Sequence, residues 1–345
     1  MNIKVYGRDS YFYKVLFSNF SNEDTIEMMR GDVKKKDITD DDIVVLISNN
    51  LEQISKVIRT LSPSTPLLLF NRNSNYDFFD ETLSLIIILQ PPFDIFSIRT
   101  AINKLKLFVS KRKELDKVIA GKSLAMTTLK SQIIISSLLT IPIHLLGESG
   151  VGKTMAAKLI HSSSSFTKPP VYINCANLNS SLAESDLFGH IKGSYTGALT
   201  ERKGLLYQAD ESTLILDEIE NLSLDMQSKL LDTIENGRYR TIGSDSIRKS
   251  SFRLITISQK SLEELLEENK IRKDFYYRIS SLLITIPPLR ERMEDIPQII
   301  NYYEEKMKIK KGRIKNYTPL MNTEWNGNVR ELLHYLDRFF SMKVH

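Results

Sequence analysis

The segment Gly147–Thr154, GESGVGKT, matches the phosphate-loop pattern G-x-x-x-x-G-K-[ST] at every position. The apolar run Ile141–Leu146 before it is typical of a buried strand, and Met155–Ile160 after it is compatible with a helix. Backbone N–H groups and a helix N-terminus together attract phosphate, so this context favours a nucleotide site over a turn that merely links strand to helix. The residues expected to bind the nucleotide are Gly147, Glu148, Ser149, Gly150, Val151, Gly152, Lys153 and Thr154. Within this set, Lys153 would reach the β- and γ-phosphates and the Thr154 hydroxyl would bind Mg²⁺.

A second apolar run, Thr213–Glu218 (TLILDE), is closed by two carboxylates. Ligands of parallel sheets bind at the carboxyl ends of the strands, which is where these acids would lie. We expect Asp217 to order the Mg²⁺ hydration shell and Glu218 to polarise the water that attacks the γ-phosphate. One strand with terminal acids is a weak indication alone, but after a phosphate loop it favours ATP hydrolysis.

Later segments carry residues that could act in the same reaction. Arg272 and Arg278 stand beside an aromatic cluster and could pair with surface acids or neutralise charge in a neighbouring subunit's ATP site. Ser258 and Gln259 follow the apolar strand Phe252–Ile257 and could sense the γ-phosphate or merely cap the strand. The sequence leaves both pairs of alternatives open.

Two glycine-bounded segments predict exposed loops. Gly193–Gly197 (GSYTG) sets a tyrosine and a threonine between glycines, which favours a mobile tip that contacts a partner. Gly237–Gly243 predicts a second loop after the helical run Leu224–Glu235.

Composition limits the class of protein. The 345 residues are 41% hydrophobic and 26% charged, as in ordinary globular proteins, and the length allows two or three domains. The net charge is +5, and the lysines and arginines are scattered among acidic residues, so the charge pattern does not indicate nucleic-acid binding. Cys175 is the only cysteine, which excludes an intrachain disulfide and agrees with a reducing compartment. The most hydrophobic run, Leu83–Leu89, is too short to span a bilayer, and the N-terminus shows no signal peptide. We therefore expect a cytoplasmic protein.

The first 107 residues alternate strand and helix patterns, which predicts a doubly wound α/β domain with a parallel sheet. The predicted strands are Ile3–Tyr6, Ile43–Ile47, Leu67–Phe70 and Leu85–Leu89, and the predicted helices are Phe12–Phe20, Leu51–Leu61 and Ile95–Leu107. This layout resembles the receiver domain of two-component response regulators. Its chemistry is missing, since Ser48 and Asn49 stand where receivers have the phosphorylated Asp, and Gln90 stands at the position of their Lys. We interpret Asp40–Asp42 as a solvated turn and infer a degenerate receiver; an unrelated interaction domain is the alternative.

From about Val118 to its end, the chain closely resembles the AAA+ ATPase domain of bacterial enhancer-binding proteins, which remodel RNA polymerase holoenzyme carrying sigma-54. The matching motifs are GESGVGKT (Walker A), LILDEI (Walker B), GSYTGA for the family's GAFTGA loop, PPLRERMEDI at the lid and WNGNVREL at sensor II. The resemblance implies that Asn174 holds Glu218 until ATP is sensed, and that Arg330 lies near the phosphates. It implies that Arg272 and Arg278 act across a subunit interface. The loop implied to touch sigma-54 consists of Gly193, Ser194, Tyr195, Thr196, Gly197 and Ala198.

The departures from the family pattern are few. Ser194 and Tyr195 replace Ala and Phe in the loop, and the aromatic face and Thr196 are kept, which favours retained sigma-54 contact. Ser258-Gln259 stands at sensor I, where the family has Thr-Asn or Thr-His, and Asn326 stands where it has Pro.

The expected architecture is a degenerate receiver-like domain (1–107), a linker helix (108–117), an AAA+ α/β subdomain (118–286) and a helical lid (287–345). The resemblance implies ATP and Mg²⁺ as cofactors and a homo-oligomer, a hexameric ring that is a dimer when inactive. The sequence ends at His345 without a helix-turn-helix segment, so either the protein acts without sequence-specific DNA binding or the sequence has been trimmed. We expect the first alternative, and we expect no membrane association. The alternatives are an AAA+ regulator of another partner and a decayed ATPase that serves as a regulatory binding module.

Overall fold

The computed structural model describes residues 2–7, 25–29, 32–39, 41–71, 85–90, 94–178, 183–195, 198–309 and 312–341. Contacts divide the chain into two compact units, Met1–Ile135 and Ser136–His345. Each unit contains a five-stranded parallel sheet with its own hydrophobic core.

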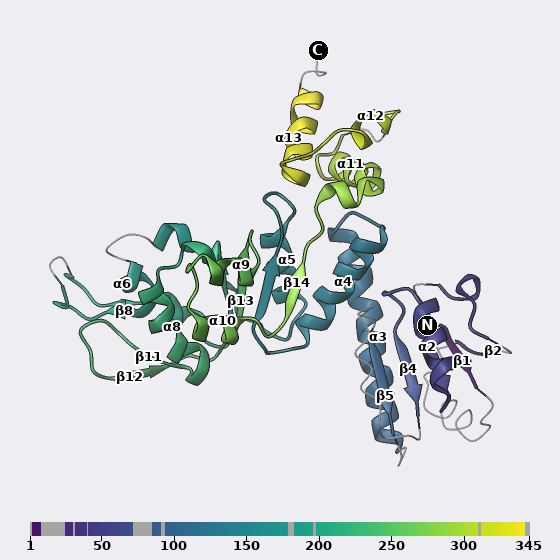
Figure 1. Ribbon diagram of the computed structural model, residues 1–345, viewed down its shortest axis with the longest axis horizontal. Helices are drawn as coiled ribbons and strands as arrows, with labels where there is room; N and C mark the ends of the chain where they lie inside the picture. The colour runs from purple at the N-terminus through teal and green to yellow at the C-terminus, as the bar shows by residue number, and fades with distance from the viewer. Residues whose placement is uncertain are drawn as a thin grey trace. The chain divides into compact units, whose positions relative to one another are not determined.

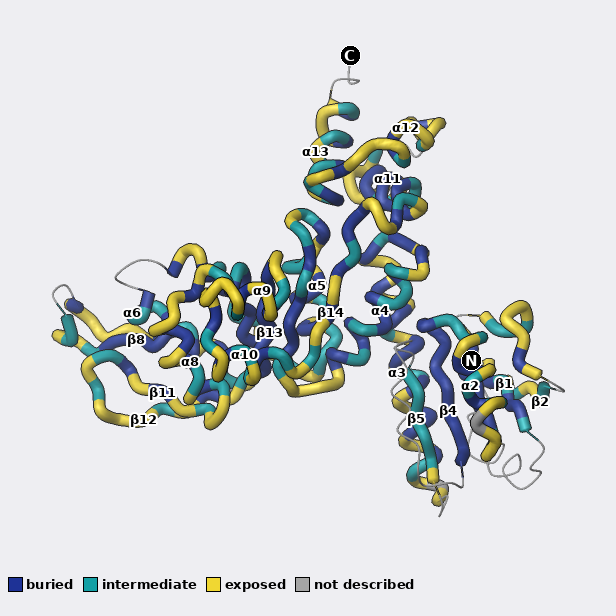
Figure 2. Tube along the Cα trace, in the orientation of Figure 1, coloured by how far each residue is buried: buried dark blue, intermediate teal, exposed yellow. Residues whose placement is uncertain are grey.

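The first unit is a doubly wound α/β domain followed by long helices (Figure 1). Its elements, the last of which runs across the unit boundary, are β1 (Asn2–Tyr6), β2 (Thr25–Met29), η1 (Lys35–Asp37), β3 (Ile43–Ile47), α2 (Leu51–Thr60), β4 (Leu67–Phe70), β5 (Ile86–Leu89), α3 (Ile95–Val118) and α4 (Leu124–Ser137). The sheet order β2-β1-β3-β4-β5 is that of the flavodoxin-like folds and agrees with the expected receiver-like layout. Strand β4 is buried from end to end, as Figure 2 shows, because helices cover both faces of such a sheet.

The sequence predictions for this unit hold to within one residue for β1, β3, β4 and β5 and miss the edge strand β2. Strand β2 was missed because its residues, TIEMM, are half polar and partly exposed at the edge of the sheet. The predicted helix Phe12–Phe20 lies outside the described residues. Helix α3 is continuous, so the predicted linker 108–117 belongs to the same helix as 95–107; Asp94 caps its start by accepting from the Ser97 N–H at 2.8 Å.

The carboxyl end of β3 is used to start a helix. Ser48 Oγ donates to Gln53 Oε1 at 2.7 Å. Asn50 Oδ1 accepts from the Glu52 N–H at 2.9 Å and from the Gln53 N–H at 3.2 Å, which caps α2. Polar groups at this position therefore have a structural role.

Asp42 corrects the interpretation of the acidic cluster as a solvated turn. It is fully buried, and its carboxylate lies 2.9 Å from Lys4 Nζ and accepts from the Thr39 N–H at 2.6 Å. Burial raises the pKa of Asp42, but the hydrogen bonds from Thr39 and Lys4 outweigh it and hold the pKa below its usual value. Asp41 remains exposed beside Lys113, at 3.2 Å.

The second unit combines a parallel sheet, two short hairpins and a group of C-terminal helices (Figure 1). Its elements are β6 (Ile143–Leu146), α5 (Lys153–Ser162), β7 (Val171–Asn174), η2 (Cys175–Leu178), α6 (Ala183–Phe188), β8 (Gly189–His190), β9 (Arg202–Lys203), α7 (Leu205–Gln208), β10 (Ser212–Asp217), η3 (Ile219–Asn221), α8 (Leu224–Asn236), β11 (Arg238–Arg240), β12 (Ile247–Lys249), β13 (Phe252–Ser258), α9 (Leu262–Glu267), α10 (Lys273–Ile279), β14 (Leu283–Thr285), η4 (Leu289–Glu291), η5 (Met293–Asp295), α11 (Ile296–Lys306), α12 (Thr318–Met321) and α13 (Asn328–Ser341). The sheet order is β14-β6-β13-β10-β7, and all its pairings are parallel. The carboxyl ends of β6, β13, β10 and β7 therefore meet at one edge.

The segment Gly237–Gly243, predicted as a loop, contains strand β11, which pairs with β12 in an antiparallel hairpin. Gly237 ends α8 in the left-handed region, with φ +66°, so the chain turns directly from helix into strand. The prediction was wrong for 238–240, where the strand follows Gly237 directly, whereas Gly243 does lie in the turn between β11 and β12.

A polar chain joins β6 to β13 inside the core. His144 is fully buried, with Nδ1 2.8 Å from Thr256 Oγ1 and Nε2 3.0 Å from Ser258 Oγ. Ser258 donates its own proton to Lys260 O, so it accepts from His144 Nε2–H, and Nδ1 accepts from Thr256. These bonds satisfy a neutral imidazole, whose one N–H donates and whose other nitrogen accepts.

Acid is expected to destabilise this unit through His144. Burial lowers the pKa of His144 from 6.5 to about 4. The unfolded chain therefore binds the proton more readily, and stability present above pH 6.5 is lost as the pH falls towards 4, by about 3 kcal/mol. The measurement is the urea unfolding midpoint across this range for the chain and for His144→Gln, whose amide keeps both bonds without titrating. Equal pH dependence in the two proteins would contradict the assignment.

Candidate ATP site and contact loop

The phosphate loop joins β6 to α5, as its pattern predicts. Gly150 and Gly152 have φ of +79° and +108°, a region that glycine enters without a Cβ clash. A Cβ on Gly152 would have no heavy atom within 4 Å, so space is open at the N-terminus of the ten-residue helix α5. The first N–H groups of a helix lack partners within it and attract anions, so the loop fits a phosphate.

Lys153 is the first residue of α5, and its ammonium turns back onto the loop. Nζ donates to Gly147 O at 2.7 Å and to Glu148 O at 2.9 Å. Burial lowers the pKa of Lys153, and the nearby carboxylates of Asp217 and Glu220 oppose that shift. The ammonium is thus held over the loop, where a phosphate oxygen could replace a carbonyl as acceptor.

Asp217 ends β10 and lies against the phosphate loop. Its Oδ2 accepts from Thr154 Oγ1 at 2.9 Å and from Tyr172 OH at 2.7 Å. A hydroxyl beside a carboxylate is an oxygen pair of the kind that Mg²⁺ binds, so the residues fit that ion. Burial, together with the bond to Asp217, raises the pKa of Tyr172 to about 12. Tyr172 was missed because one tyrosine in a short strand gives no motif signal.

Glu218 and Asn174 lie at the same sheet edge but have different partners. Glu218 has φ +55°, which is uncommon outside glycine and often marks functional positions. Its carboxylate accepts from Asn221 Nδ2 at 3.3 Å. Asn174 stands opposite Asp217 in the strand register, and its Oδ1 accepts from the Ala176 N–H at 2.8 Å. Among the described residues, the amide that bonds to Glu218 is therefore Asn221, which the sequence analysis did not single out.

The C-terminal helices close over the loop. Arg330 lies in the first turn of α13, where its backbone N–H donates to Gly150 O at 3.2 Å and its Nη1 to Ser149 Oγ at 3.3 Å. A Cβ at Gly150 would stand 2.2 Å from Gly327 O. The backbones approach so closely that only glycine fits at position 150.

Two further residues fasten these helices and were missed. Asn328 is 1% exposed; its Nδ2 donates to Glu148 Oε2 at 3.1 Å and to Ser149 O at 3.0 Å, and its Oδ1 accepts from the Leu289 N–H at 2.8 Å. Arg290 Nη2 lies 2.6 Å from Glu148 Oε1, and this bond lowers the pKa of Glu148. Both stand in motifs that were noticed, but sequence spacing does not say what they touch.

The two sensor I residues have separate roles. Ser258 is 1% exposed and bonds to His144 inside the core, which favours the structural alternative for this residue. Gln259 is exposed at the sheet edge, and its N–H donates to Glu220 Oε1 at 3.4 Å. Any contact with a γ-phosphate therefore falls to Gln259.

Arg272 and Arg278 stand at the two ends of α10. Arg272 forms two hydrogen bonds to Asp274, at 3.0 and 2.8 Å, and is 41% exposed. Arg278 Nη2 donates to Ile234 O at 3.2 Å, near the C-terminus of α8, and to Glu235 O at 3.5 Å. Within the part of the chain that the structure describes, neither arginine bonds to the phosphate loop of its own chain.

The contact loop is defined as Gly193, Ser194, Tyr195, Thr196, Gly197 and Ala198. Thr196 and Gly197 lie outside the described residues. The Gly193 N–H donates to Ala198 O at 2.9 Å, and the Ala198 N–H donates to Tyr195 O at 3.0 Å. The base of the loop is therefore a closed turn.

The contact loop rests on its neighbours through Tyr195 and Ser194. The Tyr195 ring packs edge-on against His190, with 5.1 Å between ring centroids. Ser185 Oγ forms a hydrogen bond of 2.6 Å with His190 Nδ1, which holds the imidazole in place. A Cβ on Gly243, in the turn between β11 and β12, would stand 2.6 Å from Ser194 Cβ. The two loops predicted separately thus pack against each other.

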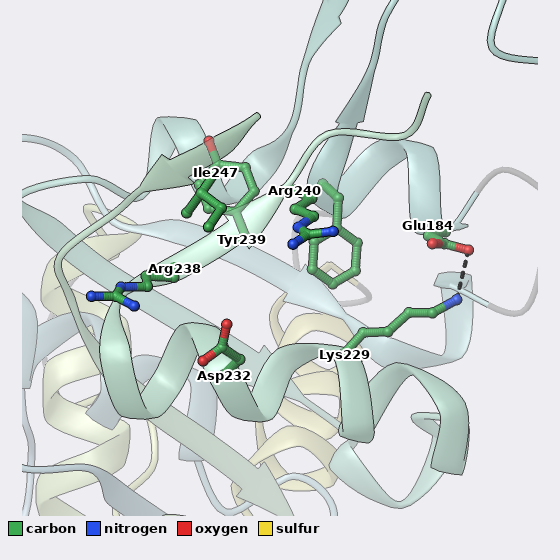
Figure 3. Close-up of a pocket in the computed structure, with 8 residues that line it drawn as sticks. Glu184, Lys229, Asp232, Arg238, Tyr239, Arg240 and Ile247 are labelled. Atoms are coloured by element: carbon green, nitrogen blue, oxygen red, sulfur yellow. Dashed lines mark ion pairs between the residues drawn. The ribbon is translucent and has the colours of Figure 1, made fainter. Parts of the chain in front are cut away.

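An open pocket of about 440 Å³ lies away from the phosphate loop, beside α8. Figure 3 shows its lining residues, which are Glu184, Phe188, Lys229, Asp232, Arg238, Tyr239, Arg240 and Ile247. Lys229 closes one end by pairing with Glu184 at 3.0 Å. None of these residues is among those assigned to the ATP site.

Comparison with known proteins gives the family. A family profile described as "Sigma-54 interaction domain" matches residues 119–285, and one described as "AAA+ ATPase lid domain" matches 290–345. The transcriptional regulatory protein ZraR of Escherichia coli (strain K12) is 36% identical over 301 residues, which cover 82% of this chain and 68% of ZraR. The chain belongs to the sigma-54-dependent transcriptional activators.

Other members are similar over the same region. The anaerobic nitric oxide reductase transcription regulator NorR of Serratia proteamaculans (strain 568) is 38% identical over 236 residues, 66% of this chain and 46% of NorR. This activator therefore spans about half the length of the NorR relatives it matches. The structure of NtrX from Brucella abortus in complex with ATP has a TM-score of 0.59 and 20% identity, covering 99% of this chain and 82% of that chain. That likeness concerns the fold.

Family membership confirms the expected α/β fold of a sigma-54-dependent activator with an AAA+ ATPase lid domain. Across the described residues, no helix is both long and apolar enough to cross a membrane.

Proposed function

We propose that this sigma-54-dependent activator hydrolyses ATP at subunit interfaces and uses the energy to remodel RNA polymerase holoenzyme carrying sigma-54. The observation that carries the proposal is the 2.9 Å hydrogen bond between Thr154 and Asp217, which joins the phosphate loop to the acidic end of β10. Phosphoryl transfer needs positioning and charge neutralisation, and this arrangement supplies both.

Each residue of the site has a defined task. Lys153 would bind the β- and γ-phosphates, and Thr154 and Asp217 would hold Mg²⁺, which would supply positive charge beside the phosphates. Glu218 accepts a proton from the attacking water, and Arg330, bonded to Ser149, approaches the phosphates from the lid.

The arginines are assigned to the neighbouring subunit of a hexameric ring. Arg272 and Arg278 bond to Asp274 and to carbonyls near the end of α8, and no described bond joins them to their own phosphate loop. If Arg272 exchanged the Asp274 carboxylate for a phosphate of the ATP bound by the next subunit, it would stay paired and would neutralise negative charge in the transition state.

In this proposal, the ATP hydrolysis cycle moves the contact loop against sigma-54. Glu218 accepts a hydrogen bond from Asn221. We assign a hydrogen bond between Glu218 and Asn174, in place of this one, to a different nucleotide state. The contact loop would then move on the support formed by His190 and the turn at Gly243.

Tyr195→Ala is expected to separate ATP turnover from transcription. The variant should hydrolyse ATP at the wild-type rate, because the ring contact of Tyr195 is with His190, and none of the hydrogen bonds described for the ATP site involves Tyr195. Open-complex formation should fall by about 30-fold, the loss typical of an aromatic anchor removed from an interface. The measurements are phosphate release and open-complex yield with sigma-54 holoenzyme. Tyr207→Ala, at an exposed tyrosine of α7, is the control; normal open-complex yield from Tyr195→Ala would contradict the assignment.

A further inference from the structure

Glu220 lies two residues after Glu218, in the short turn η3, and the tasks assigned above leave it unused. Its Oε1 accepts a long hydrogen bond, 3.4 Å, from the Gln259 N–H, which links the end of β10 to the turn after β13. Its Oε2 is buried and has no hydrogen-bond partner among the described residues. An orphaned buried oxygen costs about 1–3 kcal/mol or more, so a group that is absent from the protein itself is expected to satisfy it.

The carboxylate of Glu220 lies at the sheet edge that carries the phosphate loop. The turn η3 follows the carboxyl end of β10, and Gln259, which bonds to Glu220, follows the carboxyl end of β13. Strand β13 pairs with β6, whose carboxyl end leads into the phosphate loop, so Glu220 and Gln259 are placed beside that loop. The site therefore has three carboxylates, and the third is the one tied to sensor I.

The same position explains what Oε2 would accept. ATP phosphates are acceptors and repel a carboxylate, so they cannot satisfy this oxygen. A water molecule beside the γ-phosphate can donate to it, while Gln259 stays attached through Oε1. Such a water would direct one proton at Glu220 and would keep its second proton free for Glu218.

We propose that Glu220 is a positioning residue for ATP hydrolysis: it anchors the sensor I turn through Gln259 and orients a water beside the γ-phosphate through its second oxygen. The inference rests on the ATP hydrolysis proposed above. No proton is transferred to Glu220 in this role; the proton of the attacking water goes to Glu218.

Two substitutions separate the two oxygens. Glu220→Gln keeps a carbonyl oxygen for the Gln259 N–H but replaces the other acceptor by an NH₂ donor, whereas Glu220→Ala removes both. Glu211→Gln is the matched control, since Glu211 precedes the opposite end of β10, is 74% exposed and pairs with Lys168 at 2.9 Å. ATP turnover is measured by phosphate release, and the Gln259 amide by hydrogen exchange of a peptide spanning it in nucleotide-free protein.

We expect Glu220→Gln to lower kcat about tenfold, with KM for ATP within about twofold and exchange at Gln259 unchanged. Glu220→Ala should lower kcat at least as far and also accelerate that exchange, and Glu211→Gln should change neither. A kcat of Glu220→Gln within about twofold of wild type would overturn the water-orienting role, and unchanged exchange in Glu220→Ala would overturn the sensor I anchor. If the proposed ATPase function itself is wrong, the wild-type chain will show no ATP turnover. In that case the hydrogen-exchange measurement still tests whether Glu220 anchors the sensor I turn.

Discussion

Replacing Glu218 by glutamine is expected to lower ATP turnover by about 10²–10⁴-fold while ATP still binds, because the loss of a positioned general base has effects of that size. Glutamine has nearly the same shape and can still bond to Asn221, but it cannot accept a proton from water. Binding should persist because the groups assigned to the phosphates, above all Lys153, are untouched. The measurements are phosphate release and titration with a fluorescent ATP analogue.

The control is Glu267→Gln, at an exposed glutamate of α9, which should retain wild-type turnover. Turnover of Glu218→Gln within about tenfold of wild type would contradict its role as the base. Loss of ATP binding would instead indicate that the change had disturbed the turn at Glu218, where φ is +55°.

Arg272→Ala is expected to lower ATP turnover by about 10³–10⁵-fold, the size of effect that a charge-neutralising arginine from a neighbouring subunit has in phosphoryl transfer. In the described part of its own chain Arg272 is paired with Asp274 on the surface, so its removal should leave folding and ATP binding intact. Arg278 is a less selective target, since it also bonds to carbonyls near the end of α8, and its removal should lower the melting temperature as well.

Mixing two inactive variants tests whether the site is shared. Glu218→Gln retains the arginines, and Arg272→Ala retains the acidic residues. In a ring assembled at random from equal amounts, about a quarter of the interfaces combine an intact Glu218 with an intact Arg272. Turnover should recover accordingly, whereas turnover that stays at the level of either variant alone would show that the two residues do not serve one site.

The strands of both sheets were predictable wherever a parallel strand is buried on both faces. Strands β3 and β4 begin and end at the predicted residues, because continuous apolar runs bounded by polar residues have few other uses in a globular protein. Strand β11 was missed because it is short, alternates arginine with one buried tyrosine and directly follows a glycine.

The phosphate loop could be found from sequence because its glycines and Lys153 are local, and their spacing alone defines the motif. What holds it in place could not be predicted. Asn328 and Arg290 reach Glu148 from more than a hundred residues along the chain, and the bond from Asn221 to Glu218 depends on a left-handed residue within a turn. Such contacts depend on the tertiary fold, which leaves no periodic signal in the sequence.

The close approach of Gly150 to Gly327 makes the last helix a lever. Helix α13 starts one residue after Gly327, is 14 residues long and therefore extends about 21 Å from its fulcrum at the phosphate loop. A tilt of about 5° at that fulcrum would displace the far end of the helix by about 2 Å. Any tilt of α13 about this point would therefore be largest at Ser341.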